Sequence, residues 1–126
     1  LFDTYQIPYS CLAPEHHELI TSAGKQNGGV IVRGGIAQGG PEATIQRPQL
    51  NDVWQSAALD DYLGTNMTRA QLILRYTLSH PHCHTSIVGT CNEKHLSENI
   101  EAASLGALPI DLYTKISERV AGVLRE

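Results

Sequence analysis

The chain has 126 residues, of which 41% are apolar and 17% charged, and this composition is typical of one small globular domain. Its net charge of −4 comes without any basic run, since the nine lysines and arginines are scattered, so we expect no nucleic-acid partner and no anionic-membrane patch. No apolar stretch approaches the roughly 20 residues that span a bilayer, and the N-terminus has no signal-peptide pattern, so we expect a cytoplasmic protein.

The first half of the chain predicts two strands separated by a helix. Residues 3–8 are rich in β-branched and aromatic residues and end at a proline, as a strand does. Apolar residues then recur at helical spacing over residues 15–25. Residues 29–33 form a short continuous apolar run, which is typical of a strand in a parallel sheet. The chain starts at Leu1 directly before a strand, so we expect it to be a piece of something longer.

The middle of the chain predicts a loop and two helices. Residues 34–42 contain four glycines, whose backbone can approach a ligand closely but can equally form a plain flexible loop. Residues 49–63 predict a helix around Trp54. Residues 68–80 predict the clearest helix in the sequence, with Pro81 just past its end.

The last part predicts a strand over residues 85–88, a turn, and a helix from Glu93 with Asn92 as its N-cap. On that helix, Leu96, Ile100 and Ala103 recur at a spacing near 3.6. Residues 109–125 predict a final helix whose buried stripe is Leu112, Ile116, Val120 and Val123.

The turn over residues 89–92 joins a strand to a helix and carries a glycine. Free backbone N–H groups and the positive end of the helix then point at one spot, which suits an anion such as a phosphate. Many turns of this kind bind nothing, so the geometry leaves both interpretations open.

The order of elements predicts an α/β fold with parallel strands alternating with helices. Three parallel strands alone would leave both outer edges of the sheet unpaired, so we expect missing strands or another chain to cover them. The same elements fit the final three strand-helix units of an eight-fold barrel.

Two short motifs lie around the turn: Ile87-Val-Gly-Thr90 and His95-Leu-Ser-Glu-Asn99. Together they resemble the cofactor-binding segment at the last barrel strand of the aldo-keto reductases. Residues 2–10 resemble the sixth strand of that family, residues 29–39 its seventh strand and loop, and residues 72–81 the helix before its last strand. The resemblance implies that residues 1–126 are a single partial domain, the C-terminal part of a TIM (β/α)8 barrel.

The resemblance also implies a nicotinamide nucleotide site. Gln6 matches the glutamine that bonds the nicotinamide carboxamide, although an ordinary polar strand end is the alternative, and Arg33 would stack on the ring or meet the pyrophosphate. The loop over the pyrophosphate would comprise Gly34, Gly35, Ile36, Ala37 and Gly39. The pocket for adenosine and its 2′-phosphate would comprise Gly89, Thr90, Cys91, His95, Glu98 and Asn99.

Two positions depart from the family pattern. Cys91 lies where a lysine or arginine is frequent, and His95 lies where other branches have arginine. The resemblance implies NADP as the cofactor, and these two departures keep NAD open as the alternative.

The catalytic Asp, Tyr, Lys and His of the family come from earlier strands, and none is matched in this chain, so we expect no catalytic residue here. The intact protein would reduce an aldehyde or ketone, a small-molecule carbonyl substrate, with hydride from the cofactor. The alternatives are a non-catalytic nucleotide-binding regulatory subunit on the same barrel, like the potassium-channel β subunits, and a separate silent domain.

Two other groups of residues have side chains that could bind a metal or act as a nucleophile. The segment His80-Pro-His-Cys-His84 has the residue types of a metal site, but neighbours at this spacing lie on opposite sides of the chain, so we predict no metal site. Cys91 and His95 are at helical spacing and could form a nucleophile and base, but no third group that orients them is evident. With Cys11 and Cys83, the cysteines number three, which fits reduced thiols.

Overall fold

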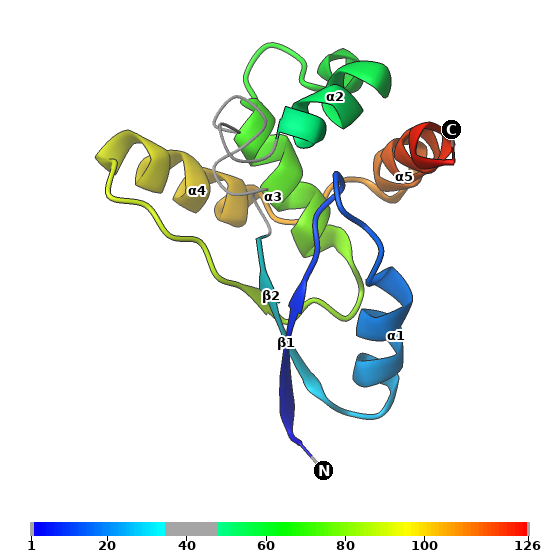
Figure 1. Ribbon diagram of the computed structural model, residues 1–126. Helices are drawn as coiled ribbons and strands as arrows, with labels where there is room; N and C mark the ends of the chain where they lie inside the picture. Colours follow the sequence, from blue (N-terminus) through cyan, green and yellow to red (C-terminus); the bar gives the residue numbers. More distant parts are fainter. Residues whose placement is uncertain (1, 35–47, 126) are drawn as a thin grey trace.

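The structure, a computed structural model, describes residues 2–34 and 48–125 (Figure 1). Three parallel strands form one sheet in the order β1-β2-β3. Their bounds are β1 Thr4–Pro8, β2 Gly29–Arg33 and β3 Thr85–Ser86. The expected α/β fold with parallel strands is therefore confirmed.

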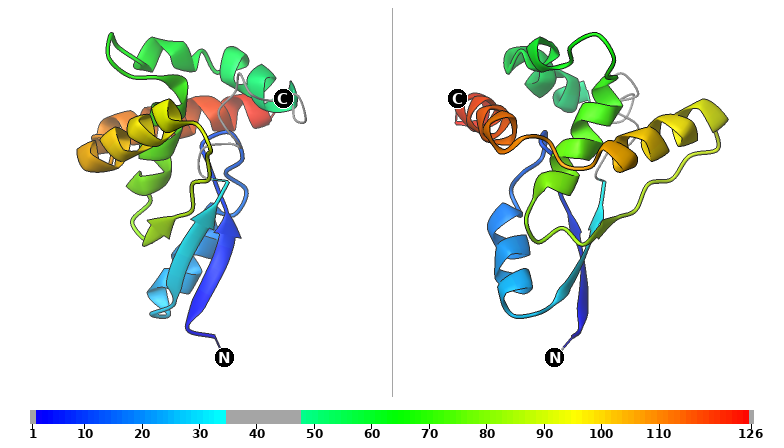
Figure 2. Two further views of the ribbon diagram at one scale, coloured as in Figure 1. Left: turned by 90° about the vertical axis from the view of Figure 1, so that its left-hand side faces the viewer. Right: turned by 180° about the vertical axis from the view of Figure 1, so that it is seen from behind.

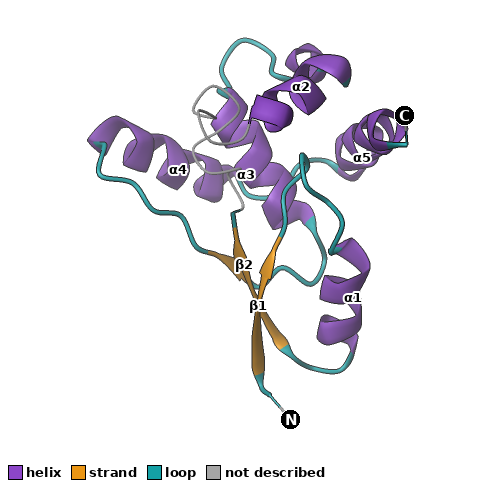
Figure 3. Cartoon of the chain, in the orientation of Figure 1, coloured by secondary structure: helices purple, strands orange, loops and turns teal. Residues whose placement is uncertain are grey.

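Helices connect and cover these strands (Figure 3). They are α1 His17–Lys25, α2 Pro48–Ser56, the short 3-10 helix η2 Leu59–Tyr62, α3 Arg69–Ser79, α4 Glu93–Leu105 and α5 Ile110–Leu124. None of the helices in the described ranges is long and apolar enough to cross a membrane.

The strand order determines where the connecting helices lie. Each strand pairs with the next one along the chain, so the sheet grows in one direction without reversal. Crossovers between parallel strands are right-handed, and successive right-handed crossovers in one direction place their helices on the same face. This is the arrangement in a (β/α)8 barrel, whereas a doubly wound sheet reverses its strand order and is covered on both faces.

The strand register separates two rows of side chains. In one row Ile7 pairs with Val32, which pairs with Ser86. Ile7 and Val32 are 4% and 0% exposed, so this row faces the helices. Helical residues complete the core on that side, chiefly Ile20, Trp54, Leu72, Ile73, Ile116 and Val120.

The other row lies on the opposite face because successive residues of a strand point to opposite sides. There Gln6 pairs with Ile31, which pairs with Thr85. Gln6 and Thr85 are exposed and Ile31 is half-buried. In the left view of Figure 2, β1 and β2 lie in front of α1 and present this face to the viewer. We call it the open face.

Local signals at the helix ends agree with the sequence. Thr68 caps α3 in a capping box: its Oγ1 accepts a hydrogen bond from Gln71 N at 3.1 Å, and Thr68 N donates to Gln71 Oε1 at 3.0 Å. The helix ends at Ser79, before Pro81. Asn92 is the N-cap of α4, as expected, and its side chain accepts hydrogen bonds from Lys94 N and His95 N.

Three elements differ from the expectation. The helix expected over residues 49–63 is two helices, since Ala58 has a φ of 51° and interrupts it. The strand expected over residues 85–88 is limited to Thr85–Ser86, because this register brings Val32 opposite Ser86 and β2 ends one residue later. On α5, Tyr113 joins Ile116 and Val120 among the buried residues, while Leu112 and Val123 are partly buried.

The apolar stripe expected on α4 is exposed. Leu96 and Ile100 are 49% and 58% exposed, and Ala103 is exposed too. The face of α4 that packs against the rest of the described chain instead carries Asn99 and Ala102. Apolar spacing predicted the helix correctly but did not identify the buried face.

The open face should promote association between chains. Ile87 continues the open-face row two residues after Thr85, and it is 51% exposed. We expect Ile87→Lys to weaken self-association, measured by sedimentation equilibrium over a range of concentrations, because a charge replaces apolar surface that association would bury.

Leu19→Lys is the matched control, since Leu19 is 53% exposed and lies on α1, on the covered side of the sheet. This substitution should leave association unchanged. A wild-type chain that stays monomeric at all concentrations would contradict the prediction, as would equal effects of the two substitutions.

The N-cap of α4 can be tested separately. Asn92→Ala removes the acceptor for Lys94 N and His95 N, which lie at 2.9 and 3.3 Å from Asn92 Oδ1. We expect the free energy of unfolding to fall by about 1 kcal/mol in urea titrations, with less hydrogen-exchange protection of these two amides. Asn92→Asp keeps the acceptor, so it should retain most of the stability and most of the hydrogen-exchange protection. Unchanged protection in the alanine variant would show that this cap contributes nothing.

Candidate functional site

The carboxyl ends of the parallel strands lie at one edge of the sheet, and polar residues gather there. Gln6 is on the open face of β1, two residues before the strand ends. Arg33 ends β2 and pairs in register with Pro8, the last residue of β1. Both Gln6 and Arg33 are exposed, so the strand ends carry an amide and a guanidinium that face solvent.

Gly34 follows β2 directly and has a φ of 69°. This is the left-handed region, which glycine occupies at no steric cost and which side chains with a Cβ disfavour. Glycine therefore fits the backbone conformation directly after Arg33 without strain. The other predicted loop residues, Gly35, Ile36, Ala37 and Gly39, lie outside the described residues.

The turn after β3 is exposed at every predicted position. Gly89, Thr90 and Cys91 all face solvent. A side chain built at Gly89 would meet no described atom within 4 Å, so packing against the described residues does not require glycine at this position. The turn therefore leaves room beside its backbone.

The N-terminal end of α4 is closed by its own residues. Asn92 Oδ1 accepts hydrogen bonds from Lys94 N and His95 N, and Asn92 N in turn donates to Thr90 Oγ1 at 3.1 Å. Two of the first-turn N–H groups that an anion would use, those of Lys94 and His95, are consequently already bonded within the chain. The side chains of Lys94 and His95 remain exposed.

The remaining predicted residues lie further along α4. His95 is exposed, Glu98 is half-buried and Asn99 is 8% exposed. Gln71 joins α3 to this part of α4, since its Nε2 donates to the backbone oxygen of Glu98 at 3.1 Å.

A groove of about 400 Å³ is lined in part by Ala102, which follows Asn99 by three residues and is buried with it on α4. Its walls include Leu63, Met67, Gln71, Arg75, Ala102 and Leu105. The volume is within the range of small-molecule sites. Sequence reasoning missed these residues, because Gln71 and Arg75 gave only the signal of a helix.

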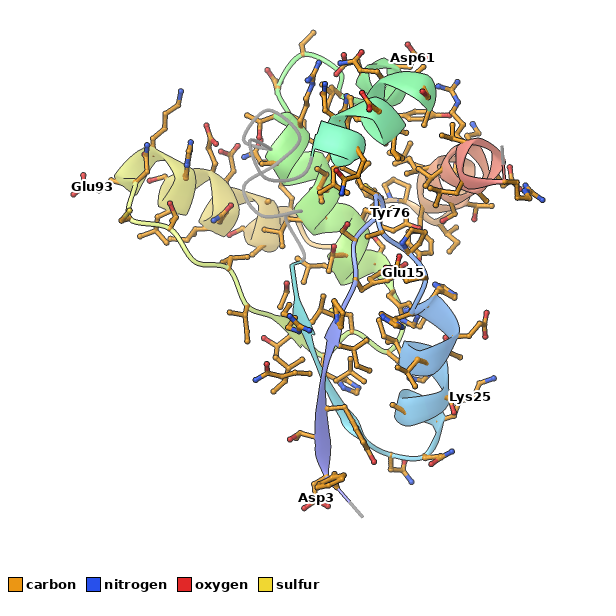
Figure 4. All side chains as sticks on the ribbon, viewed as in Figure 1. Asp3, Glu15, Lys25, Asp61, Tyr76 and Glu93 are labelled. Carbon is orange, nitrogen blue, oxygen red and sulfur yellow. The ribbon has the colours of Figure 1, made fainter. Side chains whose placement is uncertain are left out.

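The structure brings the predicted residues together in two groups. The first lies at the strand ends, with Gln6, Arg33 and Gly34, and the second lies along the turn and α4. In Figure 4, Glu93, which starts α4, lies at the end of that helix farthest from the strands. The two groups are thus apart in the part of the chain that is described.

The tyrosines that are most buried lie on the covered side of the sheet. Tyr9 Oη is 3.0 Å from Tyr113 Oη, and Tyr76 Oη is 2.6 Å from Ser117 Oγ. Burial raises the pKa of Tyr76 to about 12 and also raises the pKa of Tyr9 and of Tyr113. These hydroxyls are protonated packing groups, turned away from the open face.

Two further hypotheses concern His and Cys residues. Over residues 2–34 and 48–125, no group of three or more His, Cys, Asp or Glu side chains is placed to hold a metal ion. Cys91 and His95 are both exposed, and no hydrogen bond connects their side chains. Burial raises the thiol pKa of Cys83 to about 11 and that of Cys11 to about 12.

Comparisons with known proteins place this geometry in a family. A model of the aldo/keto reductase family matches residues 2–120. A search of curated proteins gave no match. Among solved structures, the holo form of aldo-keto reductase AKR11C1 from Bacillus halodurans has a TM-score of 0.72 and 20% identity, over 93% of this chain and 41% of that one. Its apo form has a TM-score of 0.73 and 22% identity, over 93% and 43%.

The chain spans less than half of the length of these solved structures, and at this identity they show the fold alone. That fold agrees with the parallel sheet whose helices lie on one face, which matches part of a (β/α)8 barrel. The family model covers nearly the whole chain. The chain therefore belongs to the aldo/keto reductase family.

Proposed function

We propose that this chain forms the nicotinamide nucleotide-binding part of an oxidoreductase that reduces an aldehyde or ketone to an alcohol. The observation that carries the proposal is the row of exposed polar groups at the carboxyl ends of β1 and β2, on the open face of the sheet. In a barrel, the carboxyl ends of the strands carry the active site. The membership of the chain in an oxidoreductase family supports the same conclusion.

The strand-end residues suit the nicotinamide end of the cofactor. The Gln6 amide both donates and accepts hydrogen bonds, as a carboxamide partner must. Arg33 presents a planar cation that stacks on a ring or pairs with the pyrophosphate. Gly34, with its left-handed φ, lets the backbone approach the pyrophosphate without a Cβ in the way. The bound nucleotide would supply the hydride.

The α4 residues suit the adenosine end. Asn99 would contribute an amide to the base edge, three residues before Ala102 of the groove of about 400 Å³, and Glu98 precedes it on the helix. Thr90, Lys94 and His95 offer a hydroxyl and two exposed basic side chains near the ribose. These groups fit NADP, with NAD as the alternative.

The same surface would serve a nucleotide-binding regulatory subunit. None of the most buried tyrosines faces the open side, so a proton donor would have to come from elsewhere in the barrel. The presence or absence of a tyrosine and lysine pair on the other strands separates the enzyme from the regulatory subunit. The family membership favours the enzyme.

Asn99 provides the test of nucleotide binding. In the intact protein, Asn99→Ala should raise the Kd for NADPH about fivefold, since a lost hydrogen bond costs about 1 kcal/mol. The measurement is the fluorescence change of NADPH on titration with protein, repeated with NADH to give the preference between the two.

Ser104→Ala is the control on the same helix, because the Ser104 hydroxyl is exposed and donates to its own helix at Ile100 O. It should bind like the wild type. Equal affinities of the Asn99→Ala variant and the wild type would remove Asn99 from the site, and no binding of either nucleotide by the intact protein would overturn the proposed function.

The 126-residue chain alone should be catalytically silent. Reduction of a carbonyl needs a proton donor within hydrogen-bond reach of its oxygen, and acid-base catalysis typically contributes about 10² to 10⁴-fold. We expect no NADPH-dependent reduction of 4-nitrobenzaldehyde, followed by absorbance at the NADPH band. Turnover that disappears in Tyr9→Phe, Tyr76→Phe or Tyr113→Phe would show that the proton donor lies on the covered side.

A further inference from the structure

His80 is buried where three parts of the chain meet, and the proposed function does not use it. It is the C-cap residue of α3 and is 2% exposed. The imidazole lies against α1, with the His17 ring centroid at 4.5 Å, and against the segment after β1, where the Tyr9 ring stands edge-on at 5.5 Å. The turn that leads to β3 begins at the same residue.

Its hydrogen bonds determine which nitrogen carries the proton. His80 Nδ1 accepts a hydrogen bond from the backbone N–H of His82 at 3.0 Å, so Nδ1 must be unprotonated. His80 Nε2 lies 3.2 Å from the carbonyl oxygen of His17, which can only accept, so Nε2 carries the hydrogen. Thr21 Oγ1, also 3.2 Å from Nε2, donates its own hydrogen to the same carbonyl. The ring is therefore neutral, with one assigned tautomer.

The groups around the ring offer little to balance a second proton. From α1, His17 and the carboxylate of Glu18 act on it, and from the turn His82 does. Tyr9 faces it from the end of β1, backed by Tyr76 of α3 and Tyr113 of α5, and burial keeps these three hydroxyls neutral. Burial is the largest effect and lowers the His80 pKa, while the hydrogen bond to the His17 carbonyl and, more weakly, the Glu18 carboxylate oppose it.

We propose that His80 is an acid-sensitive joint, at which protonation of Nδ1 releases the turn between α3 and β3 from the end of α3. A proton on Nδ1 would face the His82 N–H, so the acceptor that holds the turn becomes a donor. The turn leads within four residues to His84, whose N donates to Val30 O at 3.2 Å and whose Nδ1 accepts from Val30 N at 2.8 Å. Release at His80 thus loosens the attachment of β3 to β2, and the turn over residues 89–92 with it.

The sign of the pH dependence follows from the protons bound. The unfolded chain takes up a proton on this residue near the model-peptide value of about 6.5, while the folded chain does so only at lower pH. The unfolded state therefore binds more protons as the pH falls below about 6.5. His80 contributes up to about a tenfold rise in the unfolding constant per pH unit in that window, and nothing above it.

The experiment compares urea unfolding of the full chain at pH 7.5 and at steps down to pH 5. His80→Gln keeps a donor for His17 O and an acceptor for His82 N but does not titrate, so it should lack the His80 share of the acid destabilisation. His16→Gln is the control, since His16 precedes α1 and makes no side-chain capping bond. It should behave as the wild type. A His80→Gln variant as acid-sensitive as the wild type would overturn the proposal.

A second measurement uses the wild-type chain and tests the proposal even if His80→Gln fails to fold. In ¹⁵N spectra of the wild-type imidazoles, His80 should be the neutral Nε2–H tautomer at pH 7, and its titration should coincide with lost hydrogen-exchange protection of the His82 amide. An Nδ1–H tautomer or a charged His80 ring at pH 7 would refute the proposal. So would a titration of His80 that leaves the His82 amide protected.

Discussion

Helices cover only one face of the parallel sheet, and this constraint determines on which side almost every side chain of interest lies. Because the strand order runs β1-β2-β3 without reversal and the crossovers are right-handed, α1 and α3 lie on one side. Burial of Ile7 and Val32 against these helices stabilises the fold by about 1.5 to 3 kcal/mol for each large apolar side chain. The opposite row, Gln6, Ile31 and Thr85, keeps polar or half-buried groups available at the strand ends.

The covered side carries its own constraint, since polar side chains there must find partners. Tyr9 connects the end of β1 to Tyr113 of α5 and to His17 of α1. His80 connects α3 to the same carbonyl of α1 that Thr21 uses. Burial disfavours charge on the tyrosines and on His80, so it raises the pKa of Tyr9 and of Tyr113 and lowers that of His80. These groups are therefore neutral at neutral pH, and acid is the condition that introduces charge on His80.

The sequence predicted best what depends on neighbouring residues. The cap at Asn92 and the stop before Pro81 are local chemistry, and the structure has both of them. The break at Ala58 gave no such signal, because alanine favours helix and rarely takes the left-handed φ that it has here. The exposure of Leu96 and Ile100 could not be predicted from the sequence either. Helical periodicity indicates an apolar stripe, but it does not show whether another part of the chain packs against that stripe.

The candidate site was predictable only in part, for a related reason. The open face follows from the strand register, so Gln6 could be assigned to the strand ends once parallel strands were expected. That Asn99 is buried while its neighbour Glu98 is half-buried depends on how α4 rotates against α3, through the bond from Gln71 to Glu98 O. The groove lined by Gln71 and Arg75 depends on the same contact, and no spacing in the sequence encodes it.

The N-terminal end of α4 illustrates how two demands on the same atoms compete. A strand followed by a glycine-bearing turn and a helix suggests an anion site, since free N–H groups point outward there. In this chain Asn92 takes the N–H groups of Lys94 and His95 and therefore supplies the negative partial charge that a phosphate would supply. An anion that uses the N–H groups of Lys94 and His95 must therefore displace the Asn92 side chain. Under the proposed function, recognition of a 2′-phosphate would then depend on the exposed side chains of Thr90, Lys94 and His95 and on the thiol at Cys91, so the cap would shift cofactor preference from the backbone to these four side chains.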